Sequence, residues 1–365
     1  MSHSLPRERF RIVRLDLPLD AATFDSWVAA EASVSLEVRA ARGEDAATWQ
    51  ALASAHLYHV SSARDDLPAQ WCVAAPLLAR CSDLLAVTTF GAGYDTVDVD
   101  ACTAAGVCVV NQAGSNAGAV AEHTFGLIIG LSKRIGEIDR RLRRGERFSR
   151  QEAMGFDLQD RTLGLVGIGH AGTRTAQLGM AFGMTVLASD PWLEPDEIRR
   201  RGAMPVTLAE LLQSADVVSL HCPLNASTRG FFDAAAFAAM KPGALFITTS
   251  RGGIHDEAAL CDALVSGHLG GAGLDVWALE PPAADHPLLG LDKVLATHHV
   301  AGVTHDSRRQ MASMGAQQVL ALAAGSRPMR LVNPEVWPAY AQRFERAFGR
   351  SVAASPRRDE WAGRT

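Results

Sequence analysis

The segment LGLVGIGHAG, residues 163–172, limits the possible folds of this chain more than any other stretch. Its glycines, Gly167, Gly169 and Gly172, have the spacing G-x-G-x-x-G between an apolar run and the helix-compatible segment TRTAQLGMAFG. In such a strand–turn–helix unit the first glycine permits a tight turn and the second lets a pyrophosphate approach the backbone. The third lets the helix pack on the strand. The motif therefore predicts a doubly wound α/β sheet with a dinucleotide site at the helix N-terminus.

Asp190 supports this prediction. It follows the next apolar run, in VLASDPW, near the spacing of about 20 residues expected after the glycine turn. A carboxylate there accepts hydrogen bonds from an adenosine ribose and repels a 2′-phosphate. The arginines of residues 199–201 stand about one helix away, and we expect them to form a solvated face. The sequence therefore favours NAD over NADP.

Short apolar segments alternate with helical segments in two series, which implies parallel sheets covered by helices on both faces. We expect the strands of the first series at residues 9–16, 35–40, 57–62, 84–91 and 106–111. Those of the second series are expected at 164–169, 185–190, 217–222, 244–250, 271–276 and 293–300. A long helix over residues 117–147 separates the series, and one over 304–325 returns the chain to the first domain. The prediction is an α/β protein with two Rossmann-like or flavodoxin-like parallel-sheet domains.

Composition narrows the class of protein. The 365 residues suffice for two domains, and a net charge of −5 gives no basic face for nucleic acid. Six cysteines without a C-x-x-C pair indicate reduced thiols and a cytoplasmic protein rather than a disulfide or zinc framework. The N-terminus lacks the apolar core of a signal peptide, and TFGLIIGLSKRI is too short to span a membrane. We expect no nucleic-acid or membrane partner.

Polar side chains follow the expected strands of the second series, where ligands bind in sheets of this kind. Arginine fits a carboxylate with two hydrogen bonds, and histidine exchanges a proton with an alcohol. Beside a nicotinamide, these groups would oxidise an alcohol next to a carboxylate or reduce the matching keto acid. The competing interpretation is a set of surface ion pairs. The residues concerned are His221, Cys222, Thr249, Ser250, Arg251, Asp275, Glu280, His298 and His299.

His298 and His299 are adjacent, and the last expected strand includes both. Successive side chains of a strand point to opposite sides, so we expect only one of the two to face a ligand. A metal site made with His305 and Asp306 is disfavoured, because no third ligand is arranged, and we expect no metal. Periodicity alone does not choose between the two histidines.

Eight segments carry a family resemblance: FGAGYDTVD, NAGAVAEHT, LGLVGIGHAG, HCPLNASTRG, MKPGALFITTSRGGIHDEAAL, GAGLDVWALEPP, HPLL and THHVAG. In this order, over residues 84–336, they resemble the D-isomer-specific 2-hydroxyacid dehydrogenases. That family includes D-3-phosphoglycerate, D-lactate and glyoxylate/hydroxypyruvate enzymes. The resemblance implies an NAD-dependent oxidoreductase that transfers a hydride between nicotinamide and C2 of a D-2-hydroxy acid or 2-keto acid.

The resemblance also implies roles for individual residues. His299 matches the catalytic histidine, and His298 stands where the family usually has a proline. Glu280 matches the partner of that histidine, and Asp275 the aspartate at the nicotinamide carboxamide. The implied catalytic residues are Arg251, Glu280 and His299. The implied substrate-binding residues are Ala92, Gly93, Asn116 and Arg251. The implied cofactor-binding residues are Gly167, Gly169, His170, Ala171, Gly172, Asp190, Cys222, Thr228, Thr249, Ser250, Asp275, His299 and Gly302.

The family's organisation implies a substrate-binding domain of residues 1–117 and 303–345, an NAD-binding domain of residues 118–302 and a tail of residues 346–365. The resemblance also implies a substrate cleft between the domains, and homodimers are usual in the family. Phosphite oxidation by a similar triad and NAD(H) sensing without catalysis, as in the C-terminal-binding corepressors, remain alternatives. Formate oxidation is less favoured, because formate enzymes have glutamine where Glu280 stands. The substrate is not readable, although His59, Ser61, Ser62 and Arg64 are expected to follow the third strand at the substrate mouth.

Overall fold

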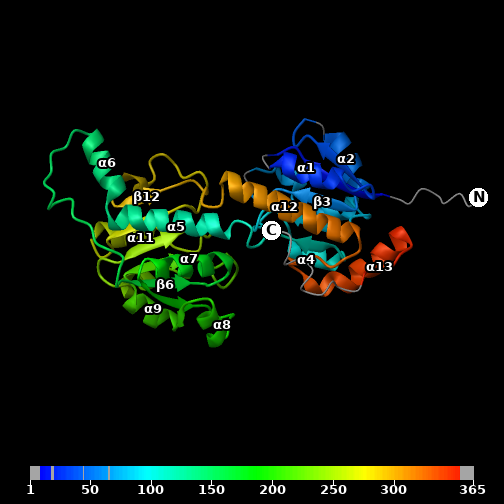
Figure 1. The fold of residues 1–365 in the computed structure, drawn as a ribbon. Helices are drawn as coiled ribbons and strands as arrows, with labels where there is room; N and C mark the ends of the chain where they lie inside the picture. The colour runs from blue at the N-terminus through cyan, green and yellow to red at the C-terminus, as the bar shows by residue number, and fades with distance from the viewer. Residues whose placement is uncertain (1–8, 18–19, 44, 65, 354–365) are drawn as a thin grey trace, which may run out of the picture. The chain divides into compact units, whose positions relative to one another are not determined.

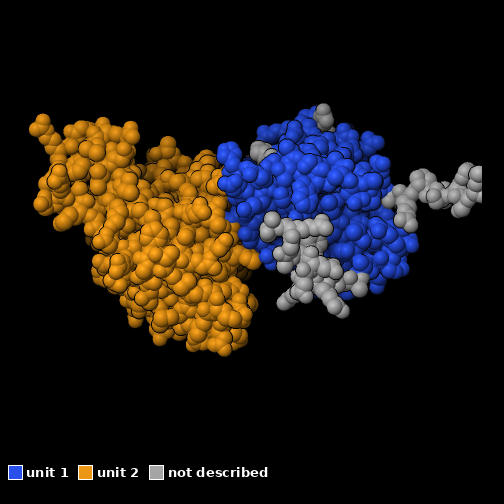
Figure 2. Space-filling view, viewed as in Figure 1, with its two compact units in different colours: residues 1–116, 305–365 blue, residues 117–304 orange. Residues whose placement is uncertain are grey.

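The protein is described here from a computed structural model, which covers residues 9–17, 20–43, 45–64 and 66–353. Contacts divide the chain into two compact units. The first unit comprises residues up to Asn116 and from His305 onward, and the second runs from Ala117 to Thr304 (Figure 2). Most of the tail expected from residue 346 lies outside the described residues, but its first residues belong to a helix that ends at Phe348.

The first unit is built on a five-stranded parallel sheet with the order β2-β1-β3-β4-β5, which is the flavodoxin-like order. Figure 1 shows this unit with its strand β3 labelled. Two apolar clusters, one on each face, form its core. The strands are β1 (Phe10–Leu15), β2 (Val34–Arg39), β3 (Leu57–Val60), β4 (Ala86–Thr89) and β5 (Cys108–Val110). The helices are α1 (Ala21–Ala29), α2 (Asp45–Ala53), α3 (Ala75–Arg80), α4 (Val99–Ala104), α12 (His305–Ala323) and α13 (Trp337–Phe348).

The second unit is built on a seven-stranded parallel sheet with the order β12-β11-β10-β9-β6-β7-β8. The order reverses between β6 and β9, and ligands of open α/β sheets bind in the crevice at such a switch point. The strands are β6 (Thr162–Val166), β7 (Thr185–Ser189), β8 (Met204–Pro205), β9 (Val217–Leu220), β10 (Leu245–Thr248), β11 (Gly271–Leu274) and β12 (Val294–Ala296). The helices are α5 (Ala117–Ser132), α6 (Ile135–Arg143), α7 (His170–Ala181), α8 (Pro195–Arg200), α9 (Leu208–Ser214), α10 (Ala234–Ala239) and α11 (Glu257–Val265).

The single helix expected over residues 117–147 was wrong. α5 ends at Ser132, Arg134 takes the left-handed conformation (φ 53°), and the shorter α6 follows. The carbonyl oxygen of Ser132, which would continue the helix, instead accepts the amide of Phe156 at 2.8 Å. A Cβ on Gly155 would lie 2.1 Å from that oxygen, so the returning chain passes directly against the end of α5. The helix breaks because a distant segment takes its hydrogen bond.

Three further expectations fail locally. The edge strand β8 was missed, because two residues give no detectable period. The last strand was expected to include both histidines, but β12 ends at Ala296. His59 does not follow the third strand: it lies inside β3, 1% exposed, with Nδ1 2.6 Å from Thr88 Oγ1. Burial lowers the pKa of His59 to about 3, so it is a neutral core residue.

In the described ranges, no helix has the length and apolar character needed to cross a membrane.

Candidate active site

The three glycines of the turn between β6 and α7 differ in how much room they leave for a side chain. Gly167 has φ 90°, and a Cβ there would lie 2.9 Å from the amide nitrogen of Cys222. A Cβ on Gly172 would lie 2.6 Å from the carbonyl oxygen of Gly167. At Gly169 a Cβ would meet no atom within 4 Å. The fold itself needs the first and third glycines, whereas the second faces open space next to the N-terminus of α7. The open space beside Gly169 leaves room for a pyrophosphate group at the helix N-terminus.

Asp190 is fixed beside this turn at the end of β7. Its Oδ2 accepts the amide of Ile168 and its Oδ1 accepts the amide of Trp192, both at 3.0 Å. Arg201 was expected on a solvated face, but its guanidinium donates to the carbonyl oxygen of Ile168 at 2.7 Å and pairs with Glu197. The arginine therefore braces the turn. Its role had no signal in the sequence beyond a run of three arginines.

The other residues expected at the cofactor lie along the same edge of the sheet, after β6, β9, β10 and β12. His170 and Ala171 begin α7. Burial raises the pKa of Cys222 to about 11, so this residue is a neutral thiol. The hydroxyls of Thr228, Thr249 and Ser250 contact Pro223, Thr124 and Leu220 respectively. Gly302 follows the turn after β12. The fold thus places the whole expected set at the carboxyl ends of one sheet.

His299 and Glu280 form the central pair of the site. Nδ1 of His299 lies 2.7 Å from Oε2 of Glu280, and the amide of Trp277 donates to the other carboxylate oxygen at 3.0 Å. Burial on its own raises the pKa of Glu280, but the hydrogen bonds from His299 and Trp277 and the charges of His299 and Arg251 outweigh it. The pKa of Glu280 lies below its usual value, so the residue is an ionised partner for an imidazolium.

Arg251 is held near this pair by a close contact between two loops. A Cβ on the next residue, Gly252, would lie 1.7 Å from the carbonyl oxygen of Trp277. The loop after β10 can therefore touch the loop that carries Glu280 only because residue 252 has no side chain. The guanidinium also donates to the carbonyl oxygen of Ser250 at 2.7 Å. An arginine, a carboxylate and a histidine are thus brought together within one unit.

His299 lies in a tight turn and not in a strand. Its φ is 47°, and its amide donates to the carbonyl oxygen of Asp275 at 2.6 Å. The alternation argument for the two histidines therefore used the wrong geometry, because the turn, rather than a strand period, orients them. The side chain of His299 is 39% exposed and the residue His298 is exposed as well.

Asp275 organises this turn. It is fully buried at the end of β11, and its carboxylate accepts the amides of Val300 and Ala301, each at 2.9 Å. It also accepts the hydroxyl of Thr297 at 2.6 Å. The resemblance gives Asp275 a contact to the nicotinamide carboxamide; the geometry gives it a second task, holding the segment that carries the histidine.

The expected substrate residues Ala92 and Gly93 form a loop after β4 in the first unit. The loop is braced by Ser62, whose Oγ accepts the amide of Gly91 at 2.6 Å, and by Asn111, which donates to the carbonyl oxygen of Ala92 at 2.9 Å. In the described part of the chain, the amides of Ala92 and Gly93 donate no hydrogen bond to protein. Two such amides suit an anion. Asn116 lies immediately before α5.

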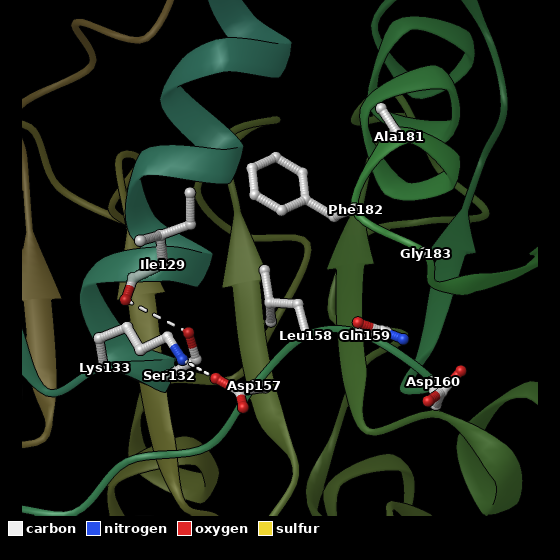
Figure 3. Close-up of a pocket in the computed structure, with 10 residues that line it drawn as sticks. All are labelled: Ile129, Ser132, Lys133, Asp157, Leu158, Gln159, Asp160, Ala181, Phe182 and Gly183. Atoms are coloured by element: carbon white, nitrogen blue, oxygen red, sulfur yellow. Dashed lines mark hydrogen bonds and ion pairs between the residues drawn. The ribbon is translucent and has the colours of Figure 1, made fainter.

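A hollow of about 600 Å³ in the second unit lies near the start of β6 and β7, at the amino ends of the strands (Figure 3). Phe182, Leu158 and the Lys133–Asp157 ion pair are among its lining groups. Because the glycine turn, Asp190 and His299 all follow strands, the hollow is separate from them. Among the described residues, no group of histidine, cysteine or carboxylate side chains has a metal-binding arrangement.

Residues 125–301 match the family described as "D-isomer specific 2-hydroxyacid dehydrogenase, NAD binding domain". Over 236 residues, the chain is 44% identical to the (S)-sulfolactate dehydrogenase of Chromohalobacter salexigens, covering 64% of this chain and 76% of that enzyme. The chain belongs to the D-isomer specific 2-hydroxyacid dehydrogenase family. As a member of it, the chain binds NAD in its second unit.

Other relatives extend the comparison. The D-3-phosphoglycerate dehydrogenase of Bacillus subtilis is 37% identical over 265 residues, which cover 72% of this chain but only 49% of that enzyme. The chain thus spans about half the length of the phosphoglycerate enzymes it matches. The D-lactate dehydrogenase of Aquifex aeolicus, solved with NAD and lactic acid, superposes with a TM-score of 0.74 at 28% identity. That match covers 86% of this chain and 96% of that one.

Three residues that support the His299–Glu280 pair were not singled out from the sequence: His123, Trp277 and Thr297. Trp277 donates its amide to Glu280 and its ring Nε1–H to the carbonyl oxygen of Thr297 at 2.9 Å. His123 Nε2 lies 3.0 Å from Thr297 Oγ1. Trp277 stands three residues before Glu280, which was a usable signal. The contact from α5 to the turn after β12 joins residues far apart in sequence and had none.

Proposed function

We propose that this protein is an NAD-dependent 2-hydroxyacid dehydrogenase in which Arg251, Glu280 and His299 carry the reaction. The observation that supports this best is the Glu280–His299 pair at 2.7 Å, on the same edge of the sheet as the glycine turn. The charge of Arg251 acts on Glu280, so the three groups share one electrostatic environment. The family match and the named relatives, which act on 2-hydroxy acids, support the same reaction class.

In this proposal Arg251 binds the substrate carboxylate through its planar guanidinium. By the family resemblance, the amides of Ala92 and Gly93 and the side chain of Asn116, all in the first unit, are proposed as further substrate contacts. His299 accepts the hydroxyl proton during oxidation and returns it during reduction, while ionised Glu280 stabilises the charged imidazole. NAD, when bound, supplies the hydride acceptor. Gly169 and Asp190 would hold its pyrophosphate and ribose, and the thiol of Cys222 and the hydroxyls of Thr249 and Ser250 line the rim.

A substrate panel tests the reaction class. NADH absorbance is followed with glyoxylate, pyruvate, hydroxypyruvate and the 2-keto acids corresponding to 3-phosphoglycerate and sulfolactate. We expect turnover with at least one of them. Oxidation of phosphite with NAD would favour the phosphite alternative. Tight NADH binding without turnover on any compound would favour the NAD(H) sensor, and the proposal would then be wrong.

The Glu280→Gln substitution gives a signed pH prediction. Keto-acid reduction needs protonated His299, and an ionised carboxylate 2.7 Å away favours that form. The glutamine carries no charge, so it no longer stabilises the imidazolium. The pKa of Glu280 lies below its usual value, so its contribution is present above that pKa and is lost as pH falls through it. We therefore expect kcat for reduction to fall about 10-fold in the variant, and the acid limb that Glu280 gives the wild-type profile to disappear. An unchanged kcat profile would remove Glu280 from this role.

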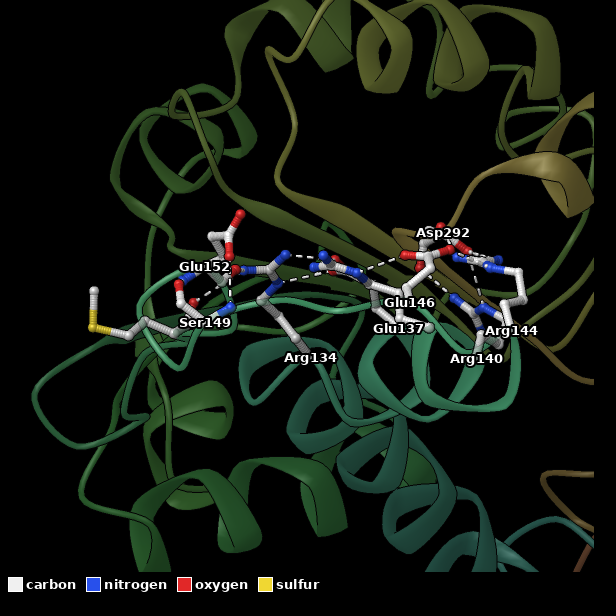
Figure 4. Close-up of polar contacts among 10 residues, drawn as sticks. Arg134, Glu137, Arg140, Arg144, Glu146, Ser149, Glu152 and Asp292 are labelled. Carbon is white, nitrogen blue, oxygen red and sulfur yellow. Dashed lines mark hydrogen bonds and ion pairs between the residues drawn. The ribbon is translucent and has the colours of Figure 1, made fainter.

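We also propose a homodimer formed through an arm of the second unit, α6 with the following residues to Met154. Three large apolar side chains on this arm, Ile135, Leu142 and Met154, are 55%, 62% and 68% exposed. Ionic contacts fix the arm: Arg144 pairs with Glu146 and with Asp292, at 2.6 and 2.8 Å (Figure 4). An arm that is held in place and carries exposed apolar side chains suits a contact with the same arm of a second copy, related by a two-fold axis. A cytoplasmic location is proposed on the sequence grounds given above.

The arm is tested by light scattering during gel filtration. We expect the wild type to have twice the mass of the chain and an Ile135→Asp/Leu142→Glu variant to have the mass of one chain. Val265→Glu is the matched control, because Val265 on α11 is at least as exposed as the two substituted residues, at 68%, but lies outside the arm. A dimer that survives the double substitution would place the interface elsewhere.

A further inference from the structure

The turn that carries His299 needs support from outside itself. A non-glycine residue at φ 47° is in the left-handed region, which L residues rarely adopt, and such conformations persist when neighbouring groups fix them. His299 donates its backbone amide to the carbonyl oxygen of Asp275, which anchors the turn at one point. The orientation of the imidazole toward Glu280 therefore depends on what holds Asp275 and the residues beside His299.

The side chain of Asp275 provides the second anchor. Its buried carboxylate accepts three hydrogen bonds, and all three donors come from residues 297–301, which surround His299. A carboxylate with no exposed surface is stable as an anion only when charges or donors compensate it. Asp275 and the turn thus stabilise each other.

The direction of the hydrogen bonds reveals a third participant. The hydroxyl of Thr297 has one proton, which it donates to Asp275 at 2.6 Å. It must then accept from His123, whose Nε2 lies 3.0 Å away. His123 therefore carries its ring proton on Nε2, and that nitrogen is 3.7 Å from the Asp275 carboxylate. The result is a directed relay from His123 through Thr297 to Asp275.

We propose that His123 is a positioning residue for His299, which it serves through Thr297 and Asp275. His123 lies on α5, whose apolar face is buried against the sheet of the same unit, so it ties the turn to a rigid element. The charged groups that face the relay and the pair are Asp275, Glu280 and Arg251. The effect on turnover rests on the proposed function, whereas the effect on the His299–Glu280 contact does not.

Two substitutions separate the roles of His123. His123→Leu removes the donor, and His123→Gln keeps an N–H near the position of Nε2 without a titrating ring. The first readout is the NMR signal of the His299 ring Nδ1–H in the full-length protein without substrate, at fixed pH and assigned with a His299→Asn variant. We expect this hydrogen-bonded signal to weaken in His123→Leu, because the contact to Glu280 loosens, and to recover in His123→Gln.

The second readout is steady-state kinetics on the best keto acid. We expect kcat to fall about 10-fold in His123→Leu while KM for NADH stays within 2-fold, and His123→Gln to recover most of kcat. His298→Leu, which changes the exposed neighbouring histidine, should match the wild type in both readouts. These orders of magnitude follow from a misplaced acid–base group.

Three results would overturn the inference. They are a wild-type His299 ring signal in His123→Leu, a His123→Gln variant as impaired as His123→Leu, and a parallel loss of NADH binding and thermal stability. A wild-type protein without turnover on any keto acid, combined with the expected changes in the His299 ring signal, would support the positioning role and remove only the proposed function.

Discussion

A His299→Ala variant is expected to lose turnover by a factor of about 10²–10⁴, the usual contribution of a general acid–base group, and to keep its affinity for NADH. The imidazole is the proton-exchanging group of the pair with Glu280, and no neighbouring side chain duplicates it in the proposed mechanism. Turnover is measured by NADH absorbance and binding by the fluorescence of NADH.

The left-handed conformation at position 299 requires a second variant. Alanine is disfavoured at φ 47°, so part of its effect would come from the backbone, whereas asparagine tolerates this region. His299→Asn should therefore lose as much activity with less loss of stability. His298→Ala is the matched control, because it changes the adjacent exposed histidine. Wild-type turnover in either His299 variant would contradict the assignment.

A Gly252→Ala variant is expected to show the largest loss of stability of any conservative substitution proposed here. Its Cβ would lie 1.7 Å from the carbonyl oxygen and 2.2 Å from the carbonyl carbon of Trp277, and backbone atoms cannot move aside as a flexible side chain does. We expect a loss on the order of 4 kcal/mol, or a fall in Tm of about 10 °C, unless the protein fails to fold.

The same substitution should damage the site. Separating the two loops moves Arg251 away from the segment that carries Glu280, so residual folded protein should have little turnover. Gly290→Ala is the control, because a Cβ there meets no atom within 4 Å and its φ is not in the left-handed region. Differential scanning calorimetry compares the two. A Gly252→Ala protein with the Tm of the wild type would mean that the loops approach each other differently.

The sequence was sufficient to predict the two parallel sheets, because their strands are short apolar runs between recognisable helices. It was also sufficient to place the glycine turn beside Asp190, since both follow strands at a known spacing. Strand ends were less accurate. The break between α5 and α6 was invisible, because Phe156 takes the helix's last hydrogen bond across a gap of more than twenty residues.

The candidate site was likewise predicted only in part from the sequence. Arg251, Glu280 and His299 came from family motifs, and the fold brings them together on one edge of the sheet. The supporting residues did not, because their contacts cross between elements: Arg201 reaches back to Ile168, and His123 on α5 reaches Thr297 after β12. His59 had been expected at the substrate mouth and is a core residue instead. Side-chain burial on a strand that is covered on both faces leaves no alternating pattern to read.

Substitutions of the three glycines in the β6–α7 turn would be tolerated to different degrees. In a library of variants selected only for folding, Gly167 and Gly172 would be retained, because side chains there collide with backbone, whereas Gly169 would drift to other residues. Selection for cofactor binding would restore all three. The difference between the two selected populations would outline the footprint of the dinucleotide without a bound structure. A motif that looks uniform in sequence therefore combines two demands of the architecture with one of its ligand.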